Sequence, residues 1–210
     1  MLPMASFQIV PQLPKDDPPA LHERAMDNLR YIRETMERAS AFTSIPGWGG
    51  FIIGLTALVT TAIAEPMTAW NPRRWLAVWL LEAVVAAAIG GLTMWRKGVR
   101  AGTPFTTSAA RRFFISYFAP LIAGAILSVT IVRGGTVTPL PSVWLLLYGV
   151  AFVSSGAFSI RVIPAMGVCF MLFGAAAAFV PLAVGNLLLG AAFGGLHIIF
   201  GLIIARNYGG

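Results

Sequence analysis

Six long apolar stretches dominate the hydropathy pattern between residues 48 and 205. A helix that crosses a bilayer needs about 17–25 mainly apolar residues. In lipid the backbone must also satisfy its own polar groups, which a helix does and an open strand edge does not. The pattern therefore predicts an all-α integral membrane protein with six transmembrane helices, at Trp48–Ala64, Trp75–Trp95, Phe113–Val132, Val143–Ile160, Val162–Val180 and Val184–Ala205.

The chain before these stretches has a different pattern. Residues 1–17 include several prolines, and we expect a flexible arm there. Asp17 suits an N-cap and Pro18 the first position of a helix, while Pro46-Gly47 would end one. These signals predict a cytoplasmic amphipathic helix at residues 18–44, followed by a six-helix transmembrane domain at residues 45–210.

The predicted helix at 18–44 has apolar residues at alternating spacings of four and three, the pattern of a heptad stripe. Its four basic and four acidic side chains cancel. A helix lying on an anionic membrane usually carries an excess of Lys and Arg, so packing against protein is favoured. Two alternatives stay open: packing on the chain's own inner loops, or association with a protein partner or a second copy. The stripe consists of Ala25, Leu29, Ile32, Met36 and Ala39.

The basic residues indicate how the spans are oriented. With six spans both termini share a side, and that side receives twelve Lys and Arg residues against three on the other. Positive loops stay in the cytoplasm, so both termini are predicted there. The same bias accounts for the net charge of +7, and no nucleic-acid partner is expected.

One loop, at residues 96–112, has a dense positive charge and no acidic residue. Each such charge near an anionic leaflet contributes on the order of 1 kcal/mol of attraction. The loop is either a topology signal only or also a site for anionic lipid. Its charged residues are Arg96, Lys97, Arg100, Arg111 and Arg112.

Polar side chains inside a membrane are the default candidates for function, and here they are Glu82, Asn186 and His197. The sequence from Glu82 to Leu92 resembles that from Asn186 to Leu196. If these spans are related repeats, Glu82 and Asn186 lie at one level, and a hydrogen bond between them is predicted. The alternative for each group is a satisfied structural bond between helices, worth about 0.6–2 kcal/mol.

Other features narrow the chemistry further. Trp70 and Trp75 flank the first outer loop, where aromatic residues anchor a protein at the membrane surface. No phosphate-binding, His-Glu-x-x-His or Gly-x-Ser-x-Gly motif occurs. With two histidines and Cys169 as the one cysteine, we expect no metal site and no cofactor.

Three segments carry a resemblance to a known group. They are residues 31–42 (YIRETMERASAF), residues 46–50 (PGWGG) and residues 186–206 (NLLLGAAFGGLHIIFGLIIAR). Together they make most of the chain resemble six-span bacterial integral membrane proteins that have no assigned activity. The resemblance implies the bacterial inner membrane and no particular mechanism.

Three functions are compatible with these features. The first is a non-enzymatic sensing or scaffolding module that lies in the lipid bilayer and acts on a protein partner, or on a homo-oligomer, through residues 18–44. The second is a small transporter or channel subunit with Glu82 as its intramembrane ionisable group. An intramembrane enzyme is the third, although no catalytic constellation is visible.

Overall fold

The computed structural model describes residues 23–32, 42–102 and 106–208. The chain divides into two units, Met1–Ala39 and Ser40–Gly210, and the first is described only at residues 23–32, which are helical. Residues 42–44, the last three of the helix predicted at 18–44, are not helical. That predicted boundary is corrected, because the backbone of Phe42 bonds to Phe158 instead of to a helical turn.

The described residues of the second unit are mostly helical. Its described residues contain no strand beyond an isolated parallel bridge between Phe42 and Ser159. The predicted all-α class is therefore confirmed. The helices are α2 (Gly47–Ala64), α3 (Met67–Trp70), α4 (Pro72–Arg100), α5 (Ser108–Arg133), α6 (Leu140–Gly156), α7 (Val162–Ala177), α8 (Leu182–Leu189), the π-helix η1 (Gly190–Leu196) and α9 (His197–Tyr208).

Local sequence explains where the long helices begin. At α4 the Asn71 side chain accepts a hydrogen bond from the Arg74 amide at 3.1 Å, and Pro72 occupies the first turn. At α5 the Thr107 hydroxyl accepts from the Ala110 amide at 3.2 Å. Such caps satisfy amides that have no partner within the helix itself.

Helix length separates two groups of apolar helices. Within the described chain, four helical segments are long and apolar enough to cross a membrane: α2, α4, α5 and the continuous run Leu182–Tyr208. Two more, α6 with 17 residues and α7 with 16, are apolar but shorter. These long apolar helices mark a membrane protein.

The two shorter helices end before the predicted spans do. The span predicted to reach Ile160 ends as a helix at Gly156, and the one predicted to reach Val180 ends at Ala177. Gly156 lies against the ring of Pro164, so the chain turns sharply into α7 there. After Ala177 the backbone closes into tighter turns, with the Ala178 amide bonded to Ala175.

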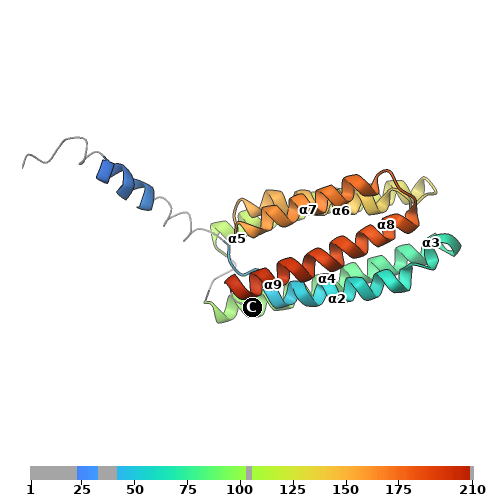
Figure 1. The fold of residues 1–210 in the computed structure, drawn as a ribbon, viewed down its shortest axis with the longest axis horizontal. Helices are drawn as coiled ribbons and strands as arrows, with labels where there is room; N and C mark the ends of the chain where they lie inside the picture. Colours follow the sequence, from blue (N-terminus) through green and yellow to red (C-terminus); the bar gives the residue numbers. More distant parts are fainter. Residues whose placement is uncertain (1–22, 33–41, 103–105, 209–210) are drawn as a thin grey trace, which may run out of the picture. The chain divides into compact units, whose positions relative to one another are not determined.

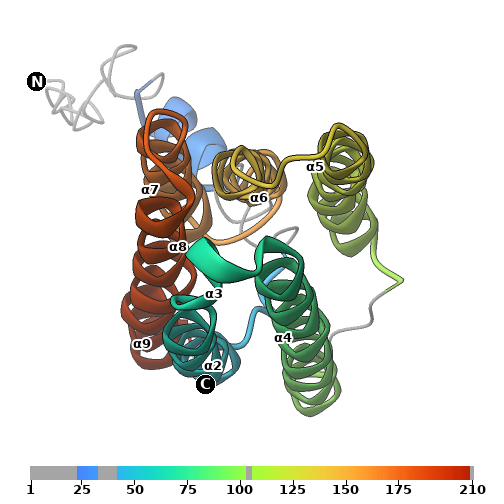
Figure 2. The ribbon, with the colours of Figure 1, turned by 90° about the vertical axis from the view of Figure 1, so that its right-hand side faces the viewer.

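The helices of the second unit form two layers (Figures 1 and 2). Layer A contains α5, α6 and α7, in which α6 packs against both of the others. Layer B contains α2, α4 and the α8–η1–α9 run, in which α2 packs against α4 and against η1 and α9. The layers meet where α7 contacts α8, η1 and α9 and where α6 contacts α8.

Glycines set the closest contacts within each layer. In layer A, a Cβ added at Gly167 would lie 2.7 Å from the Gly149 carbonyl oxygen, and one at Gly149 equally close to the Gly167 oxygen. In layer B, a Cβ at Gly54 would lie 2.7 Å from the Gly194 oxygen. Membrane helices use small residues in this way because lipid removes the hydrophobic drive for helices to associate.

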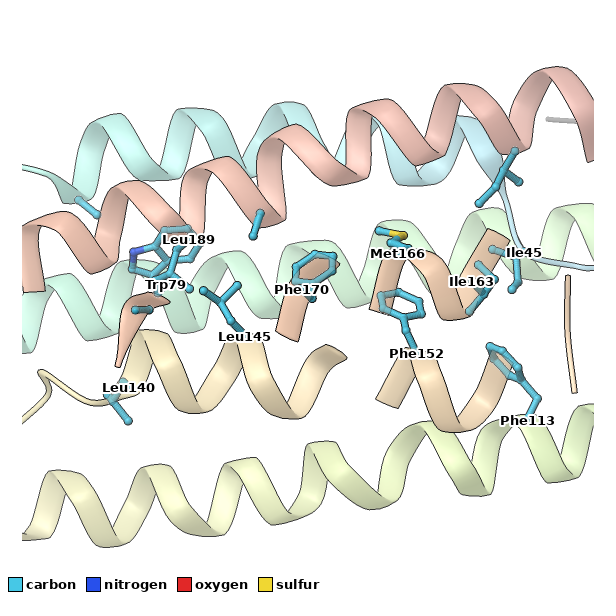
Figure 3. Close-up of a cluster of buried hydrophobic side chains, with 14 of the residues drawn as sticks. Ile45, Trp79, Phe113, Leu140, Leu145, Phe152, Ile163, Met166, Phe170 and Leu189 are labelled. Carbon is cyan, nitrogen blue, oxygen red and sulfur yellow. The ribbon is translucent and has the colours of Figure 1, made fainter. Parts of the chain in front are cut away.

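Large apolar side chains fill the space between the layers (Figure 3). Phe170 and Leu145 of layer A and Leu189 of layer B are fully buried in one cluster, and Trp79 is 4% exposed. By contrast, the outer faces of α4 and α5 carry many exposed Leu, Ile and Val side chains, as expected of surfaces that face lipid.

The glycine contacts lead to a first prediction. Gly167→Ala should lower the free energy of unfolding by about 1–3 kcal/mol, because the new methyl group has to displace backbone atoms of α6. Denaturation of the purified protein in mixed micelles with increasing SDS measures the change. Gly91→Ala is the matched control, since no described atom of a neighbouring helix lies within 4 Å of its Cβ position. Equal stability of both variants would contradict the prediction.

Candidate functional site

Asn186 is the most completely bonded polar side chain of the bundle. It lies on α8 with no exposed surface. Its carbonyl oxygen accepts from the indole nitrogens of Trp75 at 3.0 Å and Trp79 at 2.9 Å. Its amide nitrogen donates to the Thr61 carbonyl at 3.2 Å and to Glu65 Oε2 at 2.6 Å. One side chain thus connects α8 with α2, α4 and the residue that follows α2.

The predicted hydrogen bond between Glu82 and Asn186 is therefore wrong. An asparagine side chain offers two acceptor and two donor positions, and here all four are used by other residues. The residues at the level of Asn186 are Trp75 and Trp79, about a turn or two nearer the start of α4 than Glu82. Similar sequences in the two spans did not bring equivalent positions together.

Glu82 bonds to α2 instead. The carboxyl group is 8% exposed, and its oxygens accept from the hydroxyls of Thr56 at 2.8 Å and Thr60 at 3.1 Å. The Thr56 hydroxyl also lies 2.9 Å from the Ile53 carbonyl oxygen. A hydroxyl has a single proton, so Thr56 donates to one of the two oxygens at a time. When it donates to Ile53, the Thr56 oxygen still has lone pairs that can accept a hydrogen bond.

Two hydroxyl groups of α2 are the hydrogen-bond partners that the described chain gives to the Glu82 carboxyl group. No ion pair involving Glu82 occurs in the described part of the chain. A buried carboxylate without a cation is costly unless hydrogen bonds compensate for lost water. Glu82 is thus a carboxyl group held by hydroxyl hydrogen bonds between two candidate spans, α2 and α4.

His197 lies deeper in the bundle, at the contact between the layers. It is 4% exposed, and its Nε2 is 3.0 Å from the Tyr148 hydroxyl of α6. Rings surround it, with centroids 5.4 Å away in Phe170, 6.1 Å in Phe193 and 6.4 Å in Phe152. This hydrogen bond joins layer A to layer B through aromatic side chains.

Trp75 has a different place from the one predicted. It has no exposed surface, and its ring stacks on Trp144 of α6 at 5.7 Å with planes 4° apart. The prediction that Trp75 anchors the protein at the membrane surface is therefore wrong. Trp70 is 87% exposed, which suits the anchoring position predicted for it. The Asn186 acceptor explains the burial of Trp75, because a buried indole N–H needs a partner.

Sequence reasoning missed several partners of the buried groups. Thr56 and Thr60 are four residues apart and therefore share a helix face, a spacing visible in the sequence. Nothing in the sequence, however, indicated which acid they would face. The π-helix that precedes His197 was not predicted either, although its run of glycine and alanine was visible.

The apolar stripe predicted for the N-terminal helix is described in part. Ala25, Leu29 and Ile32 are exposed, Leu29 by 61% and Ile32 by 52%. Met36 and Ala39 lie outside the described residues.

The basic loop divides into two kinds of residue. Arg96, Arg100, Arg111 and Arg112 are exposed at the end of α4 and the start of α5. Lys97 differs, because its ammonium group donates to the carbonyl oxygens of Ile45 at 2.9 Å and Tyr208 at 3.0 Å. Lys97 therefore has a structural role, and four charges are left to face lipid headgroups or solvent.

Comparison with known proteins adds no family to this picture. No protein-family model, curated protein or solved structure matches the chain. Among the described residues, no group of three or more His, Cys, Asp or Glu side chains is placed to hold a metal ion. The candidate site consequently rests on the buried hydrogen bonds themselves.

The bonding of Asn186 generates the second prediction. Asn186→Leu should cost about 1–3 kcal/mol of unfolding free energy, because it leaves two buried indole donors without an acceptor. The indole N–H signals of Trp75 and Trp79 should shift in ¹⁵N NMR spectra, while that of exposed Trp70 stays in place. Asn207→Leu, at an exposed position of α9, is the control. Unmoved Trp75 and Trp79 signals would contradict the arrangement.

Proposed function

We propose that the chain is a six-span module of the bacterial inner membrane, with both termini in the cytoplasm, which senses or scaffolds without catalysing a reaction. At 1.5 Å per residue α6 and α7 are about 25 Å long, short of a hydrocarbon core of about 30 Å. A bilayer accommodates such a mismatch by local thinning. Both helices pack lengthwise in one layer with α5, a candidate span, which supports counting them as spans.

The exposed apolar stripe on the N-terminal helix carries the proposal. Large apolar side chains lie on one line of a helix whose charges cancel, and Leu29 and Ile32 are more than half exposed. In the described part of this helix the one ion pair, Arg30 with Asp27 at 3.4 Å, is also exposed. A surface of this kind is typical of a helix that pairs with another helix.

A second copy of the same chain is the partner we propose. Parallel pairing about a two-fold axis places each stripe residue opposite its own copy. The flanking positions would then pair Asn28 with Arg33 and Thr35 with Ser40 of the second copy, so no like charges meet. Because both copies are anchored in one membrane, they are held parallel at a high effective concentration. This anchoring offsets the weakness of a short stripe with two alanines.

The third prediction tests this pairing. Leu29→Asp combined with Ile32→Asp should abolish self-association in proteoliposomes, measured as energy transfer between copies labelled at the C-terminus. The new carboxylates of the two copies would repel each other at the pairing surface and would lose their hydration. Insertion should be unaffected, because the change lies outside the bundle.

A matched control separates the stripe from net charge. Arg24→Gln combined with Arg30→Gln changes the charge by the same amount but lies off the stripe and off its flanking positions. It should retain most of the energy transfer. Full transfer in the Leu29 and Ile32 variant, at several lipid dilutions, would refute self-association through this helix.

Glu82 favours a second candidate function, a small transporter or channel subunit. The specific observation is a carboxyl group buried in a candidate span with two hydroxyl partners and no ion pair in the described chain. Such groups are common in proton-coupled transport. The hydroxyl of Thr56, placed between the carboxyl and the Ile53 carbonyl, would adjust to gain or loss of the proton.

The fourth prediction concerns this alternative. If Glu82 moves protons, Glu82→Gln should abolish proton flux into vesicles, measured with an entrapped pH-sensitive dye under a potassium diffusion potential. Gln has nearly the same shape but cannot ionise. Glu65→Gln is the control, because it alters a carboxylate that bonds to Asn186. Measurable flux that is equal in wild type and Glu82→Gln would exclude the role of Glu82.

A further inference from the structure

Residues 42–46 lie directly before α2, and four of these five residues are buried, unlike most connections. Phe42 is 5% exposed, Ser44 2% and Ile45 9%. Loops usually run over a protein surface, because their peptide groups need water. Here the peptide groups of Phe42 and the carbonyl of Ile45 find protein partners instead, and these partners belong to both layers of the bundle. We call residues 42–46 the strap.

The first half of the strap is bound to layer A. The Phe42 amide donates to the Phe158 carbonyl at 2.8 Å, and the Ser159 hydroxyl donates to the Phe42 carbonyl at 2.7 Å. The Phe42 ring lies 4.8 Å from that of Phe113 and 5.5 Å from that of Phe114. Phe42 is therefore held by the α6–α7 turn and by the start of α5.

The second half of the strap is bound to layer B. Lys97, in the last turn of α4, donates to the Ile45 carbonyl and to the Tyr208 carbonyl near the end of α9. Directly after the strap, a Cβ at Gly47 would overlap the backbone of Ala205 in α9. No side chain larger than hydrogen fits where the chain enters α2.

We propose that the strap couples the two layers to the self-association of the N-terminal helix, by setting where the chain leaves the bundle. This inference rests on the proposed pairing of that helix. Buried peptide groups cannot stay unpaired without a large cost. Displacing the layers at this end therefore breaks one set of strap bonds, and the strap is then docked or released as a unit.

Release of the strap lengthens the tether of the N-terminal helix. Five extended residues add up to about 17 Å of reach. The effective concentration of two tethered helices falls as the tether becomes longer than the span that it bridges. A docked strap thus favours pairing and a released strap weakens it. No contact between the bundle and the helix itself is required.

Two variants test the strap from opposite layers. Ser159→Ala removes a bond from layer A, and Lys97→Met removes one from layer B. Hydrogen exchange of the full chain in nanodiscs, followed by mass spectrometry, should show exchange at residues 42–45 faster by about fivefold or more in each. The informative result is the cross-effect, in which Ser159→Ala speeds exchange at Ile45 and Lys97→Met speeds it at Phe42. Energy transfer between labelled copies should fall in both variants.

Ser154→Ala is the matched control. Its hydroxyl bonds to the Ser116 and Val150 carbonyls within layer A and does not touch the strap. It should change neither exchange at residues 42–45 nor energy transfer.

The outcomes distinguish this proposal from the proposed function. Faster exchange confined to the altered end overturns release as a unit, and faster exchange without loss of energy transfer overturns the coupling. In either case the pairing stands if Leu29→Asp with Ile32→Asp still abolishes transfer. If that variant keeps full transfer, the pairing itself fails, while the cross-effect on exchange still reports whether the strap bridges the layers.

Discussion

Close approach of helix backbones is the constraint on which the rest of this bundle depends. In lipid, burying an apolar side chain against another helix gains little free energy, because lipid tails are equally apolar. Helices therefore associate through packing and hydrogen bonds. The pairs α6 with α7 and α2 with η1 and α9 meet at glycines, whose missing side chains let carbonyl groups approach the facing helix. These two contacts set the spacing at which the buried polar groups can bond.

With helices this close, polar side chains find their partners on neighbouring helices. Glu82 reaches two hydroxyls of α2, and Asn186 uses all of its hydrogen-bonding capacity on residues 61–79. His197 and Tyr148 form a hydrogen bond of this kind between the two layers. These bonds give the interior specificity. Because Asn186 uses its whole hydrogen-bonding capacity within the bundle, its role is structural.

The proposed pairing concerns the N-terminal helix, and the proposed strap concerns the bundle. A membrane module that assembles through its N-terminal helix must relate the state of its bundle to the availability of that helix. The strap offers a way to do so, because its few residues bond to both layers where the chain enters α2. The same arrangement would also serve a transporter, whose layers move against each other during transport.

The sequence by itself determined the helical class and the approximate limits of the long apolar helices, because hydropathy depends on local composition and a bilayer imposes a fixed length. It also marked Glu82, Asn186 and His197 as buried polar groups, which they are. Only the tertiary structure decided their partners. Asn186 bonds to Trp75 rather than to Glu82, and Phe42, within the helix predicted at 18–44, bonds to the α6–α7 turn instead. Both outcomes depend on the rotation and offset of packed helices, which similar local sequences do not specify.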